Sequence, residues 1–179
     1  MPAAWIAPGG SKLASARYRG VEAEIAFLVG QDLPPRATPY SRDEVLAAMA
    51  SCHPAIEVLE SAFTDPVLST PGAQADLQTH GGYLYGAPFA NWRSADFSTE
   101  HVDHSIDGVV RVERTGSNTS GDLLRLLPFL ANEGAARTGG LKAGQWITTG
   151  SWTGNTLATA GSTVEAAFSN AGRVQLFFA

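Results

Sequence analysis

Two glutamates separated by one residue, Glu22 and Glu24, have the type and spacing of ligands for a divalent cation. They lie in Val21 to Gly30, where an alternating pattern followed by an apolar run predicts a β-strand. Residues two apart on a strand point to the same face, so the two carboxylates lie side by side and need a cation to offset their repulsion. Hard carboxylate oxygens suit Mg²⁺, Mn²⁺ or Ca²⁺ better than zinc, which favours His and Cys.

Glu57 is the third member of this predicted site. It lies in Ala55 to Ser61, which predicts a second strand, and its neighbours Ala55, Ile56, Val58 and Leu59 are apolar, so an unpaired carboxylate there would be costly. The alternative is that Glu22 and Glu24 only line a solvated strand face. Spacing alone leaves the two interpretations evenly balanced.

The elements that must hold these residues predict a mixed, β-rich α+β fold. The chain has 179 residues with 44% hydrophobic residues and 19 glycines, which fits one ordinary domain with many turns. Residues 1–20 are expected to form an irregular lead-in and residues 21–179 the single domain. The further strands are predicted at 81–89, 102–106, 109–114, 145–149, 163–168 and 174–178, with a hairpin turn at Asp107-Gly108.

Two helices are predicted to pack on the sheet. Ser41 and Glu44 have the spacing of a capping box and begin the first helix, which His53-Pro54 is expected to end. Leucines across Gly121 to Arg137 predict the second helix, with a kink at Pro128. The polar segment 64–78 is expected to be a surface loop.

Composition excludes several function classes. The net charge is −5 and no Lys/Arg run is present, which argues against a nucleic-acid partner. No stretch of about 18 apolar residues predicts a membrane span. Cys52 is the single cysteine and has no basic neighbour to activate it, so it is interpreted as a core thiol in a soluble cytoplasmic protein.

Asp76 and His80 are the candidates for proton transfer. Histidine is suited to general base catalysis near neutral pH, and Asp76 lies in the same polar segment, where it could orient a water. The alternative is that both are ordinary loop residues. His53 is interpreted as structural, and His101 and His104 as solvated loop residues.

Four ordered segments resemble the fumarylacetoacetate hydrolase superfamily, and within it the 2-keto-4-pentenoate hydratase and 4-oxalocrotonate decarboxylase branch. They are VEAEIAF (21–27), HPAIEVLES (53–61), FLANEG (129–134) and LKAGQWITTGSWTG (141–154). The resemblance implies a fumarylacetoacetate hydrolase-like β-roll and a Mg²⁺ or Mn²⁺ held by Glu22, Glu24 and Glu57. It also favours Ser151 and Thr153, in a turn rich in small hydroxyl residues, as substrate-binding residues.

The activity that the resemblance implies is a metal-dependent hydratase, a lyase acting on a short 2-oxo or 2-hydroxydienoic acid such as 2-hydroxypenta-2,4-dienoate in aromatic catabolism. The alternatives are a 2-oxo acid decarboxylase, an acylpyruvate C–C hydrolase, or a catalytically impaired metal-binding or accessory subunit. The last is motivated by the short N-terminus, since only twenty residues precede Val21 and no equivalent of the family's upstream lysine is evident. A homo-oligomer is expected, or pairing with a longer homologous subunit.

Overall fold

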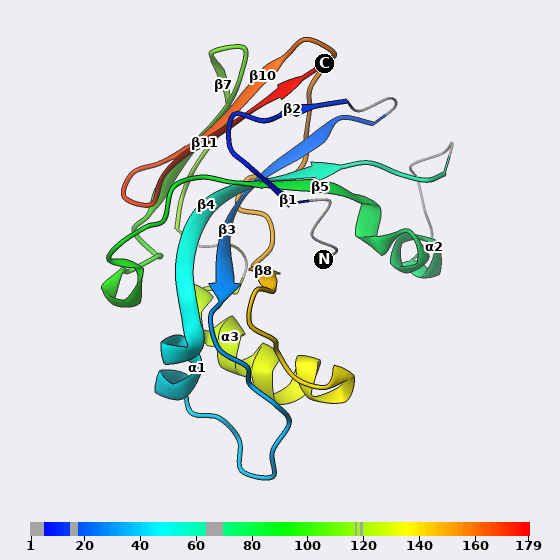
Figure 1. Cartoon of the computed structure of the whole chain (residues 1–179). Helices are drawn as coiled ribbons and strands as arrows, with labels where there is room; N and C mark the ends of the chain where they lie inside the picture. The colour runs from blue at the N-terminus through cyan, green and yellow to red at the C-terminus, as the bar shows by residue number, and fades with distance from the viewer. Residues whose placement is uncertain (1–5, 15–17, 64–69, 117, 119) are drawn as a thin grey trace.

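The computed structural model describes residues 6–14, 18–63, 70–116, 118 and 120–179, which form two β-sheets and short helices (Figure 1). The first sheet has the strand order β1-β5-β4-β3-β8, and β9 also pairs with β3. Its strands are β1 (Ile6–Pro8), β3 (Gly20–Val29), β4 (Met49–Leu59), β5 (His80–Tyr85), β8 (Trp146–Thr148) and β9 (Thr156–Leu157).

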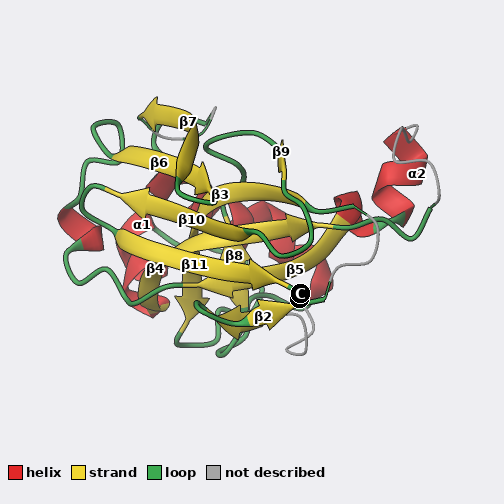
Figure 2. Ribbon diagram, turned by 90° about the horizontal axis from the view of Figure 1, so that it is seen from above, coloured by secondary structure: helices red, strands yellow, loops and turns green. Residues whose placement is uncertain are grey.

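The second sheet has the order β2-β11-β10-β6-β7. Its strands are β2 (Lys12–Leu13), β6 (His101–Ile106), β7 (Val109–Thr115), β10 (Thr163–Phe168) and β11 (Gly172–Phe178). Strands β10 and β11 lie against β4, so the second sheet packs on the first (Figure 2). The β-rich α+β fold predicted from the sequence is confirmed.

The long antiparallel pair β3–β4 is the centre of the first sheet, and both strands curve strongly (Figure 1). Alternation along β3 sends Val21, Ala23, Ile25 and Phe27 into the main core, where they are fully buried. Glu22 and Glu24 therefore face the opposite side of the sheet, as the sequence predicts.

Helix α1 (Arg42–Ala48) begins with the predicted capping box: Ser41 Oγ accepts from the Glu44 N–H, and the Glu44 carboxylate accepts from the Ser41 N–H at 2.8 Å. The predicted end at His53-Pro54 is wrong, because β4 starts at Met49. The ten-residue strand β3 needs a partner over its whole length, and pairing of Met49 with Val29 extends β4 back to the helix.

The segment before β5 is more regular than predicted. The expected surface loop contains helix α2 (Thr70–Ala75) and a 3₁₀ turn at Leu77–Thr79, while residues 64–69 lie outside the described part of the chain. The expectation of an irregular lead-in over residues 1–20 is wrong for β1 and β2, which pair in parallel with β5 and β11.

The second predicted helix is in the right place but is not one regular helix. It consists of a 3₁₀ turn (Leu123–Arg125), helix α3 (Leu126–Phe129), a π-helical turn (Leu130–Gly134) and a further 3₁₀ turn (Ala135–Thr138). Pro128 lacks an N–H donor, which prevents a continuous α-helical hydrogen-bond ladder. Within the described residues, no helix is both long and apolar enough to traverse a membrane.

Strand β6 corrects the interpretation of His101 and His104 as loop residues. The hairpin of β6 and β7 turns at Asp107-Gly108 as predicted, and both turn residues have positive φ (53° and 75°). Alternation on β6 points His104 into the space between the sheets, where it is fully buried. His101 lies at the start of the strand, next to Thr115 and Asp103.

Candidate metal centre

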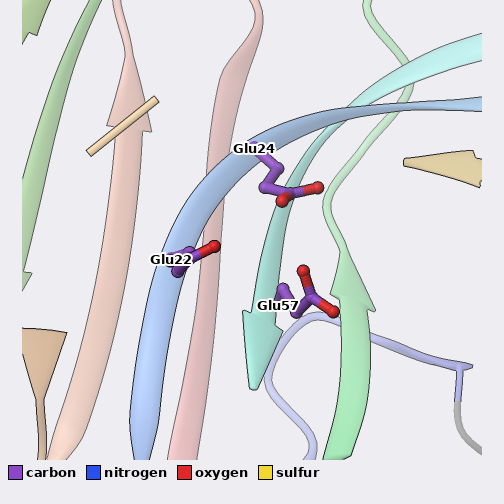
Figure 3. A group of neighbouring side chains, drawn as sticks. All are labelled: Glu22, Glu24 and Glu57. Atoms are coloured by element: carbon purple, nitrogen blue, oxygen red, sulfur yellow. The ribbon is translucent and has the colours of Figure 1, made fainter. Parts of the chain in front are cut away.

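Strand register brings the three predicted glutamates together. Glu22 on β3 is the direct partner of Glu57 on β4, and Glu24 follows two residues further along the same face. One carboxylate oxygen from each residue lies within 4.8 Å of the other two. Figure 3 shows the carboxyl groups of Glu24 and Glu57 directed toward each other, with Glu22 beside them.

Glu24 is the most deeply placed member, at 1% exposure. Its Oε2 accepts a hydrogen bond of 3.0 Å from the Tyr83 hydroxyl and another from the Thr148 hydroxyl. Tyr83 is itself 1% exposed and is the β5 partner of Glu57. Two hydroxyl groups therefore donate to one oxygen of a carboxylate that is shielded from water.

Burial sets the electrostatics of the cluster. Burial, followed by the charge of Glu57, raises the pKa of Glu24 well above its usual range, and the Tyr83 hydrogen bond opposes this shift only in part. Burial and the Glu57 charge also raise the pKa of Glu22, against a hydrogen bond from Ser151. Both acids resist ionisation unless positive charge is brought to the cluster.

His80 is the predicted catalytic candidate that lies at the cluster. It is the first residue of β5, and its Nδ1 is 2.6 Å from Glu57 Oε1. The three residues before it, Leu77 to Thr79, have positive φ between 53° and 61°, a conformation that costs non-glycine residues free energy. This left-handed turn carries the chain from α2 into β5.

Asp76 is not part of the acidic group. Its Oδ2 accepts from the Ser61 hydroxyl at 2.6 Å, and its Oδ1 accepts from the Ala62 N–H at 3.0 Å. These two bonds tie the segment before His80 to the end of β4.

The turn with Ser151 and Thr153 docks on β3 between the two glutamates. Ala23 donates its N–H to Thr153 Oγ1 at 3.0 Å, and its carbonyl accepts from the Trp152 N–H at 2.9 Å. Ser151 Oγ accepts from the Gly154 N–H and lies beside Glu22. The turn is therefore held against the strand that carries the acids.

An aromatic stack borders the site. The rings of Tyr85 and Trp146 stack with their centroids 4.4 Å apart, although β4 and β3 separate their strands. The strands between them carry Ala26 and Ala55 on this face, which are small enough to leave the rings room. His53 packs on both rings, and its ring nitrogens pair with the Gly86 carbonyl and Ser51 Oγ, which agrees with a structural role.

Sequence reasoning missed Tyr83 and Thr148. The aromatic alternation in Gly81 to Phe89 predicts a strand, but periodicity does not say which strand lies next to it. Tyr83 and Thr148 could have been identified as hydroxyl residues on the same sheet face as the acidic pair. That identification requires the strand order β5-β4-β3-β8, which the sequence does not give.

The three carboxylates fit a hard divalent cation. Among the described residues, oxygen is the only donor type in the group, and Cys52 lies in the main core instead. A cation at this position would offset the repulsion between acids that are held together by strand register.

No family model matches the chain. Its sequence is 30% identical over 171 residues to a 4-oxalocrotonate decarboxylase from Pseudomonas sp, covering 94% of this chain and 64% of that protein. It is 28% identical over 130 residues to a 2-hydroxyhexa-2,4-dienoate hydratase from Comamonas testosteroni, covering 73% of this chain and 48% of that protein. The chain thus spans less than two thirds of the curated relatives that it matches.

The fold has a solved counterpart. The 4-oxalocrotonate decarboxylase from Pseudomonas putida G7, complexed with magnesium and adipate, superimposes with a TM-score of 0.84 at 23% identity, over 98% of this chain and 67% of that one. The chain is thus similar in sequence to a 4-oxalocrotonate decarboxylase and a 2-hydroxydienoate hydratase, and its fold is that of the decarboxylase, in agreement with the resemblance to the fumarylacetoacetate hydrolase superfamily.

Proposed function

We propose that this chain is a divalent-metal-dependent hydro-lyase that adds water to a short 2-hydroxydienoic acid such as 2-hydroxypenta-2,4-dienoate. The convergence of Glu22, Glu24 and Glu57 on one sheet face carries the proposal. These residues would hold Mg²⁺ or Mn²⁺, and magnesium is present in the structure of the decarboxylase with the same fold. A bound cation supplies a Lewis acid that stabilises negative charge on the enolate oxygen of a 2-oxo acid.

The residues around the acids have separate tasks in this reaction. Ketonisation moves a proton from the enol oxygen of the diene to its distal carbon, and one water then adds across the remaining double bond, without change in electron count. His80, paired with Glu57 at 2.6 Å, is proposed to hold and release a proton. Ser151 and Thr153 are proposed to contact the substrate carboxylate, while Asp76 holds the segment that precedes His80.

A cavity beside His80 favours a substrate with one carboxylate. It has a volume of about 390 Å³ and includes Glu60 and Asp76 in its wall. No lysine or arginine lines it within the described part of the chain. The apolar side chains of Ala62, Ala75 and Leu77 in the same wall suit an unsaturated hydrocarbon tail better than a second carboxylate.

Decarboxylation of a 2-oxo acid is the second candidate, and the 30% identity to 4-oxalocrotonate decarboxylase over 94% of the chain favours it. In that reaction the carbon–carbon bond to the leaving carboxylate breaks, CO₂ departs, and the electron pair stays on the enolate. The same acids serve both reactions. The wall of the cavity beside His80 supports the first reaction, because 4-oxalocrotonate carries two carboxylates.

The test supplies the purified chain with Mg²⁺ or Mn²⁺ and follows two substrates. A hydratase removes the ultraviolet absorbance of 2-hydroxypenta-2,4-dienoate without gas release, whereas a decarboxylase releases CO₂ from 4-oxalocrotonate. We expect the first activity to exceed the second. Turnover of neither substrate by a chain that binds Mn²⁺ in a separate titration would contradict the enzymatic proposal.

Two matched variants assign the roles. Glu57→Gln should abolish Mn²⁺ binding and turnover together, because it removes a cation ligand. His80→Gln should retain Mn²⁺ binding while lowering kcat and changing its pH profile, because it removes the proton carrier. Loss of Mn²⁺ binding in His80→Gln would instead assign the histidine to positioning Glu57.

A further inference from the structure

Tyr83 and Thr148 reach Glu24 from opposite sides of the central strand pair. Tyr83 comes from β5, beyond β4, and Thr148 comes from β8, on the other side of β3. Their hydroxyl oxygens are 3.3 Å apart, and both hydroxyls donate to the same carboxylate oxygen, Oε2. Glu24 therefore sits in a clamp built by the two strands that flank the pair.

This clamp makes the two oxygens of Glu24 unequal. Oε2 is committed to two donors, so Oε1 is the oxygen left to face the other acids. Because Glu24 and Tyr83 are each 1% exposed, water does not compete for these bonds. Rotation of the carboxylate, which would present both oxygens to one cation, would break both hydrogen bonds in a buried site.

The number of oxygens that a carboxylate offers influences which cation it prefers. Ca²⁺ takes 6–8 oxygen ligands at 2.3–2.6 Å and commonly binds a carboxylate through both oxygens. Mg²⁺ requires near-octahedral geometry at 2.0–2.1 Å, which ligands that each give one oxygen satisfy best. A glutamate locked into giving one oxygen thus disfavours Ca²⁺.

We propose that Tyr83 and Thr148 are positioning residues that fix Glu24 as a one-oxygen ligand and so make the centre select Mg²⁺ or Mn²⁺ over Ca²⁺. This inference rests on the metal centre of the proposed function. It adds that the selectivity comes from two neutral hydroxyls that do not themselves belong to the acidic group.

Titration calorimetry with Mn²⁺ and with Ca²⁺ tests the inference on the whole chain. Tyr83→Phe removes one hydroxyl and keeps the ring, and it should weaken Mn²⁺ binding by about 10-fold or more, the usual effect of losing a residue that orients a ligand. Ca²⁺ binding should change by less than about 3-fold, so the preference for Mn²⁺ over Ca²⁺ falls. Thr148→Val should act in the same direction, and it supplies the test if Tyr83→Phe does not fold.

Two controls separate positioning from general packing. Thr148→Ser keeps a hydroxyl and should retain the wild-type preference for Mn²⁺ over Ca²⁺. Tyr85 lies two residues from Tyr83 on the same strand and belongs to the stack with Trp146. Tyr85→Phe should therefore leave both the Mn²⁺ and the Ca²⁺ affinity unchanged.

The outcomes distinguish this inference from the function on which it rests. Equal weakening of Mn²⁺ and Ca²⁺ in Tyr83→Phe, or no weakening of either, would overturn the selectivity role while leaving the metal centre intact. Failure of the wild-type chain to bind either cation would overturn the metal centre itself, and the inference with it.

Discussion

Glu24 in the first sheet and His104 in the second are both ionisable residues on central strands, with exposures of 1% and 0%. Burial raises the pKa of Glu24 and lowers the pKa of His104, so in both residues it favours the neutral form. The surroundings differ: Glu24 has two other acids and two hydroxyls around it, whereas His104 is flanked across its strand by Val112 and Ala166. Neither ring nitrogen of His104 has a hydrogen-bond partner among the described residues. Burial alone does not distinguish a site from a core, but a cluster of like charges does.

Glu100 makes the comparison more specific, since it is a buried acid outside the site. At 2% exposure it accepts hydrogen bonds from the Asn170 N–H, the Asn170 side chain and the Ala171 N–H. Three donors satisfy its charge locally. The neighbours of Glu24 include two acids, and this surplus of negative charge is what a cation would offset.

The largest expected effect follows replacement of Glu24 by its isosteric amide. Glu24→Gln should weaken Mn²⁺ binding by about 1,000-fold, or about 4 kcal/mol, because a buried charge partner of the cation is removed. The metal-free variant should be at least as stable as the wild type, since repulsion from Glu57 is lost. Calorimetric titration with Mn²⁺ measures the first effect and urea unfolding the second.

Glu100→Gln is the matched control for that variant. It should lower the free energy of unfolding by about 1–3 kcal/mol, because its donors lose a charged acceptor, while Mn²⁺ affinity stays unchanged. A similar loss of Mn²⁺ affinity in both variants would mean that burial of an acid, rather than its place in the cluster, determines binding.

The comparison also explains what sequence could and could not predict. The face shared by Glu22 and Glu24, the capping box of Ser41 and Glu44, and the Asp107-Gly108 turn depend on residues a few positions apart, so local geometry determines them. The hydroxyl of Tyr83 on Glu24 depends on which strand lies beside β4, a choice made by the whole sheet. The burial of His104 likewise depends on the packing of the second sheet against the first, which the residues around His104 do not determine.

The next largest effect concerns pH and His104. Burial lowers its pKa from 6.5 to about 4, so between these values the unfolded chain binds a proton that the folded chain does not. Stability that is complete above pH 6.5 is therefore lost as the pH falls toward 4. His104→Leu should remove about 2 kcal/mol of the loss between pH 8 and pH 5, measured by urea unfolding at both values.

His101→Gln is the control on the same strand. His101 has a side-chain exposure of 40%, so its replacement controls for the loss of an imidazole that is not buried. An unchanged pH dependence in His104→Leu would show that the imidazole is hydrated in the folded state, and the contrast with Glu24 would then disappear.

The smallest expected effect tests how the site is joined to the core. Thr153 Oγ1 accepts from the N–H of Ala23, a fully buried residue whose neighbours in sequence are Glu22 and Glu24. Thr153→Val keeps the shape of the side chain but leaves this N–H without its acceptor, which should lower the free energy of unfolding by about 1.5 kcal/mol, whereas Thr153→Ser should retain most of it.

If Thr153 also contacts substrate as proposed, Thr153→Val should weaken oxalate binding to the Mn²⁺-loaded chain as well. A loss of stability with unchanged oxalate affinity would mean that Thr153 only holds β3, the strand that carries Glu22 and Glu24. Ser151 would then be the one remaining proposed substrate contact in this turn.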